Sequence, residues 1–428
     1  MSAVVRGKSF LGAAMNEKIQ AFLKENGFAP TREDRMEVMR AFEGEAAAAI
    51  AGAPSSLRMI DSCISFSSVA PVTSAPVVVV DAGGTNLRVA AVRFSTDGTV
   101  FSNLRRSRMP GTDGTVSADA FHAAIAAEVD AVRALEPAVA GIGYCFSYEC
   151  RSLPDGDAEL VAWSKQVSAP EVIGQRVGAE LVRRLAGGPL PVVVLNDTVA
   201  TLLAGLSCQG KECPGQIGFI LGTGTNVACV EKGTIRNAES GECNKMARSP
   251  CDIAFDATLP DTGAALFEKM VSGAYLGGVG CKLLKVAARA GLIDGAGLDG
   301  LSLSTRDLDA FGTGDVSSPH PLTAALAPGD VPVARELVRA VFLRAVSLTA
   351  AHLAAFVRRS AEAGRSPVRV TADGSTYWKT RAVDFDGLVR KEIADLVPDV
   401  PFEIVHIDEA PMVGAAVAAG RLVLPRSA

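Results

Sequence analysis

The stretch VVVVDAGGTNLRVAAVRF, residues 77–94, places a glycine-rich turn between two apolar runs. The second run, which begins at Leu87, is short and rich in β-branched residues, so it predicts a strand. A glycine-rich turn that holds the phosphates of a dinucleotide opens a helix instead. The pattern therefore argues against a dinucleotide-binding oxidoreductase and predicts a hairpin that contacts phosphate.

A second turn of the same kind occurs further along the chain. LGTGTN (221–226), like DAGGTN (81–86), follows one apolar strand and precedes another. This repetition predicts two related half-sheets that each offer a turn to a shared cleft; a chance recurrence of turns that need positive φ is the alternative. Glycine keeps a Cβ away from the ligand, and successive N–H groups in such turns bind anions. Thr85, Thr223 and Thr225 add hydroxyl donors.

Two acidic residues follow apolar strands. Asp81 ends a run of valines, where an unpaired buried carboxylate would be costly; it is predicted to hold Mg²⁺ through water, or else to cap its own turn. Asp197, in LNDTVA, stands where a strand becomes a helix. It is a candidate base for phosphoryl transfer to an alcohol, or else a first-turn helix acid. None of the four histidines lies in a glycine-rich turn, which favours a carboxylate base.

Side chains suited to a polyhydroxylated acceptor occur elsewhere. Asn226, Glu239 and Glu268 can each bond two hydroxyl groups, although Glu268 alone is typical of a solvated helix face. Lys165, in WSKQ, is a candidate point charge on the transferring phosphoryl group, or else a surface lysine.

Bulk properties narrow the class of protein. The 428 residues are too many for one ordinary core, so two or three lobes are expected. The net charge of −5 and the lack of a Lys/Arg cluster argue against a nucleic-acid partner. The nine cysteines show no zinc-ligand spacing and fit a reducing cytoplasm. Charges interrupt the N-terminal segment and prolines interrupt 64–80, so neither a signal peptide nor a membrane span is expected.

Periodicity and turn signals predict the order of elements. Helices are expected at 31–51, 119–134, 264–290, 331–361 and 412–422, the first with Thr31 as N-cap. A Ser/Pro-rich connector is expected at 53–76. Strands are expected at 138–147 and 192–195, within 77–94 and 216–233, and in the segments SPVRVTADGSTYW and PFEIVHID.

Taken in order, these segments resemble the hexokinase family of the actin-like ATPase superfamily, from about residue 57 to the C-terminus. Eight motifs occur in the family order. They are DAGGTNLRV, FSYE (family Phe-Ser-Phe-Pro), WSKQ (family Trp-Thr-Lys-Gly), LNDTVATLLAG, LGTGTN, NAESG (family Asn-x-Glu-Trp-Gly), LFEKMVSGAYLGG and ADGSTYW.

The resemblance implies ATP-dependent phosphorylation of a hexose at its 6-hydroxyl, glucose above all, as the first step of glycolysis. Asp197 is implied as the general base, with Lys165 near the transferring phosphoryl group. The implied sugar ligands are Ser147, Ser164, Lys165, Asn196, Asp197, Asn226, Glu239 and Glu268. The residues implied to serve ATP, and Mg²⁺ through Asp81, are Asp81, Gly83, Gly84, Thr85, Asn86, Arg88, Gly222, Thr223, Gly224, Thr225, Gly374 and Ser375.

The chain departs from the family pattern in its sugar loops. Glu149 replaces a proline, Gln166 a glycine and Ser240 a tryptophan, and APMVGAA stands for a Gly-Ser-Gly-x-Gly-Ala-Ala run. None of these changes removes the base, the lysine or either turn.

The implied fold is α/β: a two-lobed actin-like ATPase (ribonuclease H-like) fold with a mixed sheet in each lobe and a cleft between them. The expected division is 1–75 and 197–411 in the large lobe, and 76–196 with a terminal helix from 412–428 in the small lobe. We expect a cytoplasmic monomer or homodimer without nucleic-acid or membrane partners. The alternatives are another sugar kinase, an actin-like or chaperone ATPase, and a catalytically inactive hexose-binding regulator on the same fold.

Overall fold

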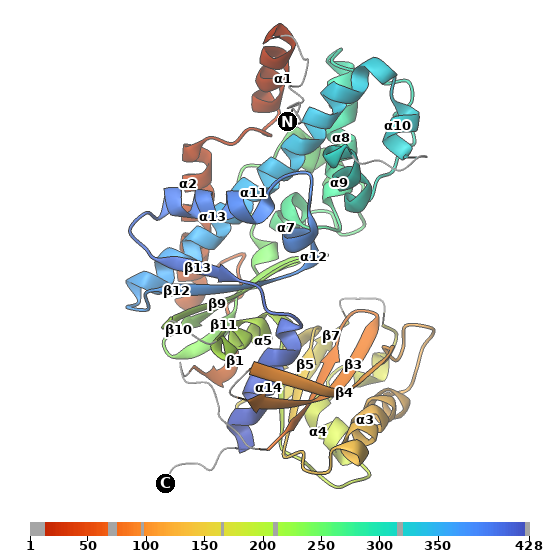
Figure 1. The fold of residues 1–428 in the computed structure, drawn as a ribbon, viewed down its shortest axis with the longest axis vertical. Coiled ribbons are helices and arrows are strands. Elements are labelled where there is room, and N and C mark those ends of the chain that lie inside the picture. The colour runs from red at the N-terminus through yellow and green to blue at the C-terminus, as the bar shows by residue number, and fades with distance from the viewer. Residues whose placement is uncertain are drawn as a thin grey trace, which may run out of the picture.

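A computed structural model describes residues 13–66, 75–95, 98–163, 167–208, 213–314 and 320–423. The described chain forms two lobes, each built on a mixed sheet (Figure 1). In the six-stranded sheet of the large lobe the order is β1-β11-β10-β9-β12-β13, and in the five-stranded sheet of the small lobe it is β4-β3-β2-β5-β8.

The strands have the following bounds. The small-lobe sheet contains β2 (Val77–Ala82), β3 (Asn86–Ser95), β4 (Gly98–Arg108), β5 (Ile142–Phe146) and β8 (Val192–Leu195). The large-lobe sheet contains β1 (Ile60–Ser65), β9 (Gly215–Leu221), β10 (Thr225–Glu231), β11 (Thr234–Asn237), β12 (Val368–Asp373) and β13 (Phe402–Val405). A separate hairpin joins β6 (Glu149–Ser152) to β7 (Ala158–Ala162).

The two sheets repeat one topology. In the small lobe, β2 pairs antiparallel with β3 and parallel with β5. Farther out, β3 pairs antiparallel with β4, and β5 pairs parallel with β8. In the large lobe, β9 pairs antiparallel with β10 and parallel with β12. Farther out, β10 pairs antiparallel with β11, and β12 pairs parallel with β13. The predicted pair of related half-sheets is therefore present, and each glycine-rich turn lies between the equivalent strands β2 and β3 or β9 and β10.

Helices cover the outer faces of both sheets and fill the space between them (Figure 1). On the small lobe these are α3 (Ala118–Leu135) and α4 (Val177–Arg183). Between the sheets lie α5 (Asp197–Ala204) and α14 (Ala410–Val423). The remaining helices belong to the large lobe: α1 (Ala13–Glu25), α2 (Arg32–Ile50), α6 (Pro250–Asp256), α7 (Leu266–Val271), α8 (Leu276–Arg289), α9 (Thr305–Thr313), α10 (Pro321–Ala325), α11 (Val331–Glu362), α12 (Ser375–Lys379) and α13 (Phe385–Leu396). Short 3₁₀ turns occur at 170–172, 205–207, 240–242 and 328–330.

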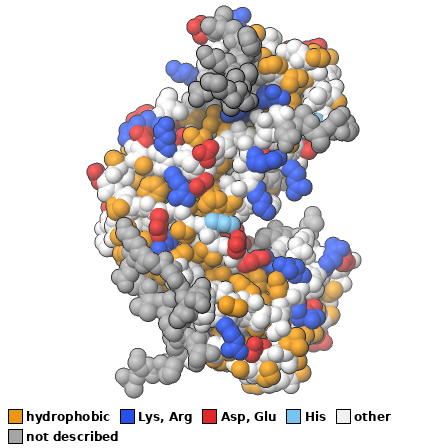
Figure 2. All heavy atoms as spheres, in the orientation of Figure 1, with side chains coloured by type: hydrophobic (Ala, Val, Ile, Leu, Met, Phe, Trp, Pro, Cys, Tyr) orange, Lys and Arg blue, Asp and Glu red, His pale blue; other side chains and the backbone are white. Residues whose placement is uncertain are grey.

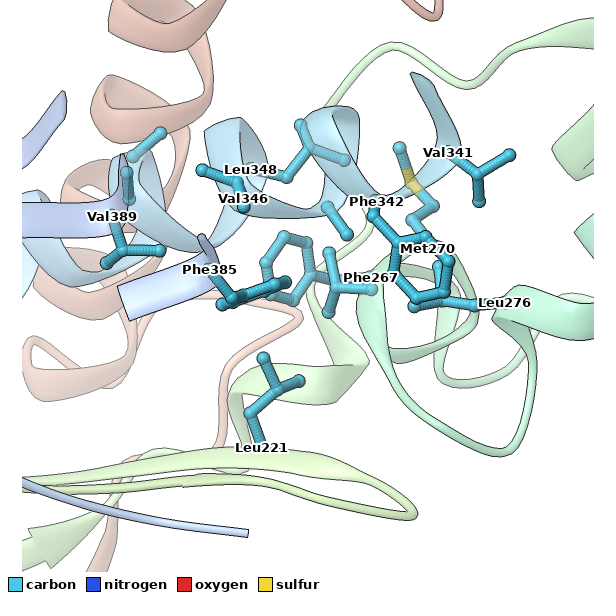
Figure 3. Close-up of a cluster of buried hydrophobic side chains, with 14 of the residues drawn as sticks. Leu221, Phe267, Met270, Leu276, Val341, Phe342, Val346, Leu348, Phe385 and Val389 are labelled. Atoms are coloured by element: carbon cyan, nitrogen blue, oxygen red, sulfur yellow. The ribbon is translucent and has the colours of Figure 1, made fainter. Parts of the chain in front are cut away.

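The core of the large lobe is organised around α11. Figure 3 shows side chains of this helix beside Phe267 and Met270 of α7, with Leu221 of β9 below them. The helix is long and apolar enough to cross a membrane, but 94% of its most apolar window is buried inside the fold. It is therefore the central helix of a globular core, as its all-round apolar surface indicates.

Most predicted elements agree with the structure. Thr31 caps α2, and its hydroxyl and Asp34 form a reciprocal capping box. The expected helix at 264–290 is instead divided into α7 and α8, because Ser272 takes an extended conformation at the end of α7 and the next helix begins only at Leu276. The connector expected at 53–76 contains strand β1, which pairs with β11 at the edge of the large sheet. Strands β4, β6, β7 and β11 were not predicted.

Glycines allow the helices between the sheets to pack closely. A Cβ at Gly414 of α14 would overlap the carbonyl oxygen of Ala200 in α5. In the same way, a Cβ at Gly143 of β5 would overlap the backbone of α14, and one at Gly218 of β9 would overlap the backbone of α5. Backbone contact at these three positions fixes how each helix lies on its sheet and on the other helix.

We predict opposite effects for one substitution at two helical glycines. Gly414→Ala places a methyl group where backbone already lies, so it should lower the free energy of unfolding by about 1–3 kcal/mol. Gly44→Ala, in α2, meets no atom within 4 Å and should raise that free energy by up to about 1 kcal/mol. Denaturant unfolding of both variants measures the difference; a stabilised Gly414→Ala variant would contradict the packing described.

Candidate active site

A cleft of about 1250 Å³ opens between the two lobes, and the space-filling view is hollowed there (Figure 2). Both glycine-rich turns and most predicted sugar ligands line it. The predicted residues among its lining are Asp81, Gly83, Gly84, Thr85, Asn86, Arg88, Ser147, Asn196, Asp197, Thr223, Gly224, Thr225, Asn226, Glu239 and Glu268. The fold thus brings together, at one cleft, segments that lie far apart in the sequence.

The first turn is supported by an ion pair across its hairpin. Asp81 and Arg88 are register partners on β2 and β3, and Arg88 donates to Asp81 Oδ2 from Nε at 2.8 Å and from Nη2 at 2.5 Å. The other side of the guanidinium pairs with Glu409, directly before α14. Asp81 was predicted to hold Mg²⁺ through water or to cap its turn. In the structure the arginine supplies the charge that the buried carboxylate needs, and a role of Asp81 toward Mg²⁺ stays a prediction.

This pairing competes with burial in setting the pKa of Asp81. Burial raises the pKa of the carboxyl group most, and the charge and hydrogen bonds of Arg88 oppose that shift. The guanidinium of Arg88 lies between Asp81 and Glu409 and neutralises both carboxylates. Arg88 also lines the cleft, and its predicted contact with the nucleotide stays a prediction.

The second turn is bound from behind by Glu268. Its Oε2 accepts the backbone N–H of Thr225 at 2.9 Å, and a Cβ at Gly224 would overlap the same oxygen. The hydroxyl of Thr225 donates to the carbonyl of Ile220 at 3.0 Å. The predicted phosphate donor Thr225 lines the cleft together with Thr223 and Gly224, but it uses both of its donors within the fold. The carboxylate predicted as a sugar ligand also shapes the phosphate turn.

Helix α7 holds Glu268 in place through its flanking residues. Phe267 is buried in the core of the large lobe. The ammonium group of Lys269 is buried and donates to Asp256 Oδ1 at 2.9 Å. At the start of the helix, Ala265 takes a left-handed conformation with φ 47° and donates its N–H to Glu242. The carboxylate thus projects from a short helix that is fixed at both ends.

Asp197 is the first residue of α5, directly after β8. The side chain of Asn196 caps the helix by accepting the N–H of Thr198 at 2.8 Å. The hydroxyl of Thr198 donates to Asp197 Oδ1 at 3.2 Å. The capping interpretation is thus correct for Asn196, and it places the carboxylate of Asp197 at the positive end of the helix, facing the cleft.

A chain of amides connects the second turn to Glu239. Asn226 donates to Asn237 Oδ1 at 2.6 Å, and Asn237 donates to Glu239 Oε1 at 2.6 Å. Asn226 Oδ1 accepts the N–H of Ser240 at 3.1 Å. Burial, followed by the charge of Asp197, raises the pKa of Glu239 to about 7. Asn237 opens the motif NAESG but was not predicted as a site residue, because its amide acts through Asn226 and Glu239.

Other residues that line the cleft were not predicted as site residues. They are Arg58, Arg106, Tyr148, Glu149, Glu242, Ile220, Thr198, Ala274, Tyr275 and Glu409. Arg58, in the large lobe, pairs with Glu149 of the small lobe at 2.7 Å, so the residue that replaces the family proline connects the two lobes. Glu409 could have been found from its position in the sequence. The segment IDEA (407–410) leads into α14 as LNDT (195–198) leads into α5, and Glu409 stands in the place of Asp197.

Some predicted residues lie elsewhere. Gly222, Gly374 and Ser375 are not part of the cleft lining. Gly222 belongs to the second turn, and Gly374 and Ser375 lie against it, since a Cβ on Gly222 would contact Gly374 Cα at 3.6 Å. Ser164 and Lys165 lie outside the described residues, as does Gln166.

The charged residues that line the cleft fit a nucleotide that carries Mg²⁺. Seven carboxylates and three arginines line the cleft within the described part of the chain. Arg58 and Arg88 are already paired with carboxylates. A polyphosphate entering such an acidic cleft needs a cation of its own, and Mg²⁺ is the ordinary partner of nucleotide phosphates. The backbone of the two turns offers the N–H groups that bind phosphate oxygens.

We predict that Glu239 makes the stability of the free protein depend on pH. Its pKa is about 7 when folded and near 4.5 when unfolded, so the folded state binds more protons between these values. The free energy of unfolding should therefore fall as the pH rises from about 5 to 7, and Glu239→Gln should reduce this fall. Unfolding curves of both proteins across this range measure it; equal slopes would contradict the assigned pKa.

Comparisons with known proteins agree with this geometry. Two family models described as hexokinase match residues 19–206 and 216–421. Hexokinase-1 of Schizosaccharomyces pombe is 28% identical over 76% of this chain and 75% of its own length. Human hexokinase-3 is 28% identical over 92% of this chain, which spans 46% of that longer protein.

Solved structures show the same fold. A hexokinase from Schistosoma mansoni, complexed with glucose, has a TM-score of 0.75 at 24% identity and covers 95% of this chain and 99% of its own. A second hexokinase crystal structure has a TM-score of 0.80 at 24% identity and covers 96% of this chain and 100% of its own. The paired family matches, which together span nearly the whole chain, show that this protein belongs to the hexokinase family.

Proposed function

We propose that this protein transfers the γ-phosphoryl group of ATP to the 6-hydroxyl of a hexose, with glucose as the preferred acceptor. The observation that carries the proposal is the position of Asp197 in a cleft shared by two glycine-rich turns and by Glu239 and Glu268. A base, two sets of phosphate donors and hydroxyl ligands are the parts that this reaction needs.

In this mechanism Asp197 accepts the proton of the attacking hydroxyl. The position of Asp197 at the N-terminus of α5 and the hydroxyl of Thr198 orient the carboxylate that acts as the base. Asn196 caps the same helix and so fixes the direction of the base. Mg²⁺ bound to the nucleotide would supply the charge that stabilises the transferring phosphoryl group.

The acceptor would be held by the amides and carboxylates of the large lobe. Asn226 and Glu239 belong to one hydrogen-bonded chain, so their positions are coupled through Asn237. Glu268 contacts the backbone of the second phosphate turn. A sugar bound to Glu268 would therefore lie against the segment that binds the donor phosphates, which brings the two substrates together.

We also propose that the protein works in the cytoplasm. The nine cysteines all lie within the described residues and form no disulfide, which supports a reducing compartment.

We predict that Asp197→Ala lowers kcat by about a hundredfold or more, the range expected for the loss of a general base. Nucleotide binding should stay close to wild type, because the carboxylate is a ligand of the acceptor. A coupled assay of ADP release with glucose, mannose, fructose and glucosamine, and with ATP and other phosphoryl donors, measures both activity and preference. Turnover near wild type in Asp197→Ala would disprove the assigned base.

Asp61→Ala provides a matched control for that variant. Asp61 lies on β1, pairs with Arg236 and is not part of the cleft lining, so its removal should leave kcat unchanged. A wild-type protein that binds hexose but releases no ADP with any donor would favour the inactive regulator instead.

A further inference from the structure

We propose that Tyr148 is a positioning residue that orients the first phosphate turn and connects it to the sugar loop. The inference rests on the proposed function, because it assigns this side chain a role in holding the donor nucleotide. The family resemblance gives Tyr148 no role; it occupies the second phenylalanine position of the family pattern Phe-Ser-Phe-Pro.

The phenol makes a short hydrogen bond to the turn. Tyr148 Oη donates to the carbonyl oxygen of Gly83 at 2.5 Å. Only 3% of the residue is exposed, yet it lines the cleft. Burial, and then the charge of Asp81, raise the pKa of the phenol, so it stays protonated and acts as a donor at neutral pH. Phenylalanine at this position would leave the carbonyl without this donor.

The geometry of the peptide unit turns this bond into a constraint on phosphate binding. In a trans peptide the carbonyl of Gly83 and the N–H of Gly84 point in opposite directions. Fixing the carbonyl toward Tyr148 therefore directs the N–H of Gly84 away from Tyr148. The N–H groups of such a turn are the anion donors, and glycine has a wide range of allowed backbone conformations. A glycine pair without a fixed carbonyl would sample several orientations and lose more conformational entropy when a phosphate binds.

The tyrosine ring reaches the sugar side of the small lobe. It packs edge-on against Trp163 with ring centroids 4.7 Å apart, and in a tilted arrangement against Phe146 at 4.9 Å. Trp163 begins the WSKQ segment, and Ser147 beside Tyr148 donates its N–H to the carbonyl of Ala82 at 3.3 Å. Through one ring and one hydroxyl, Tyr148 thus contacts the first turn and two segments that the resemblance assigns to the sugar.

Tyr148→Phe tests this role, because it removes one oxygen and keeps the ring. We expect the dissociation constant for ADP, measured by calorimetry on the full chain, to rise about three- to tenfold, the range for one hydrogen bond. KM for ATP should rise by a similar factor. The dissociation constant for glucose, and kcat at saturating ATP, should change less than twofold.

Tyr144→Phe is the matched control. Tyr144 lies on β5 in the same aromatic cluster, with its ring 5.3 Å from Phe146. Its buried hydroxyl has no hydrogen-bond partner among the described residues, so removing it should leave ADP binding unchanged.

The outcomes distinguish a failure of the positioning role of Tyr148 from a failure of the proposed function. A weakened ADP affinity in Tyr148→Phe but not in Tyr144→Phe supports the positioning role. An unchanged ADP affinity with a lowered melting temperature would show that the bond is only structural and would overturn the inference. A wild-type protein that binds neither ADP nor ATP would overturn the proposed function itself, and this inference with it.

Discussion

The close contact of α5 and α14 is the constraint on which the rest of the structure depends. Each sheet has one face against this pair of helices, and backbone meets backbone at Gly143, Gly218 and Gly414. Such packing leaves no side chain to absorb a change in helix position. It therefore fixes where the first residue of each helix lies, and both helices begin at the cleft.

Because the two lobes share one topology, an acidic residue stands at the start of both α5 and α14, and the two residues have different roles. The junction before α5 carries Asp197, and the corresponding junction before α14 carries Glu409. In the first half the carboxylate faces the cleft at a helix N-terminus. In the second half the carboxylate pairs with Arg88, which also neutralises Asp81. Equivalent positions thus became the candidate base in one half and an electrostatic support in the other.

The sequence predicted those features that depend on local chemistry. The two glycine-rich turns, the capped helix α2 and the junction at Asn196 follow from turn preference, capping and strand length. The pairing of Asp81 with Arg88 was also within reach, because a turn at 83–86 makes these residues direct partners across the hairpin. It was missed because the prediction located the two strands without aligning their residues across the turn.

Other features depend on contacts that no local pattern reveals. Glu268 binds a backbone N–H that is distant in sequence, and Asn237 acts only through its neighbours on either side. Strand β4 is charged and lies at a sheet edge, so it lacks the apolar alternation that identifies a buried strand. The division of the second half into many helices follows from packing around α11, which propensity alone does not specify.

Most carboxylates of the acidic cleft have separate partners that stabilise them. Asp81 and Glu149 each have an arginine partner, and Glu268 accepts a backbone N–H. Burial, and then the charge of Asp197, raise the pKa of Glu239, and the hydrogen bond from the amide of Asn237 only partly opposes that shift. Hydroxyl groups that donate to Glu239 would stabilise its charged form and lower that pKa. A polyhydroxylated ligand therefore supplies this carboxylate with further donors, which is a physical reason for a sugar rather than an apolar molecule to occupy this side of the cleft.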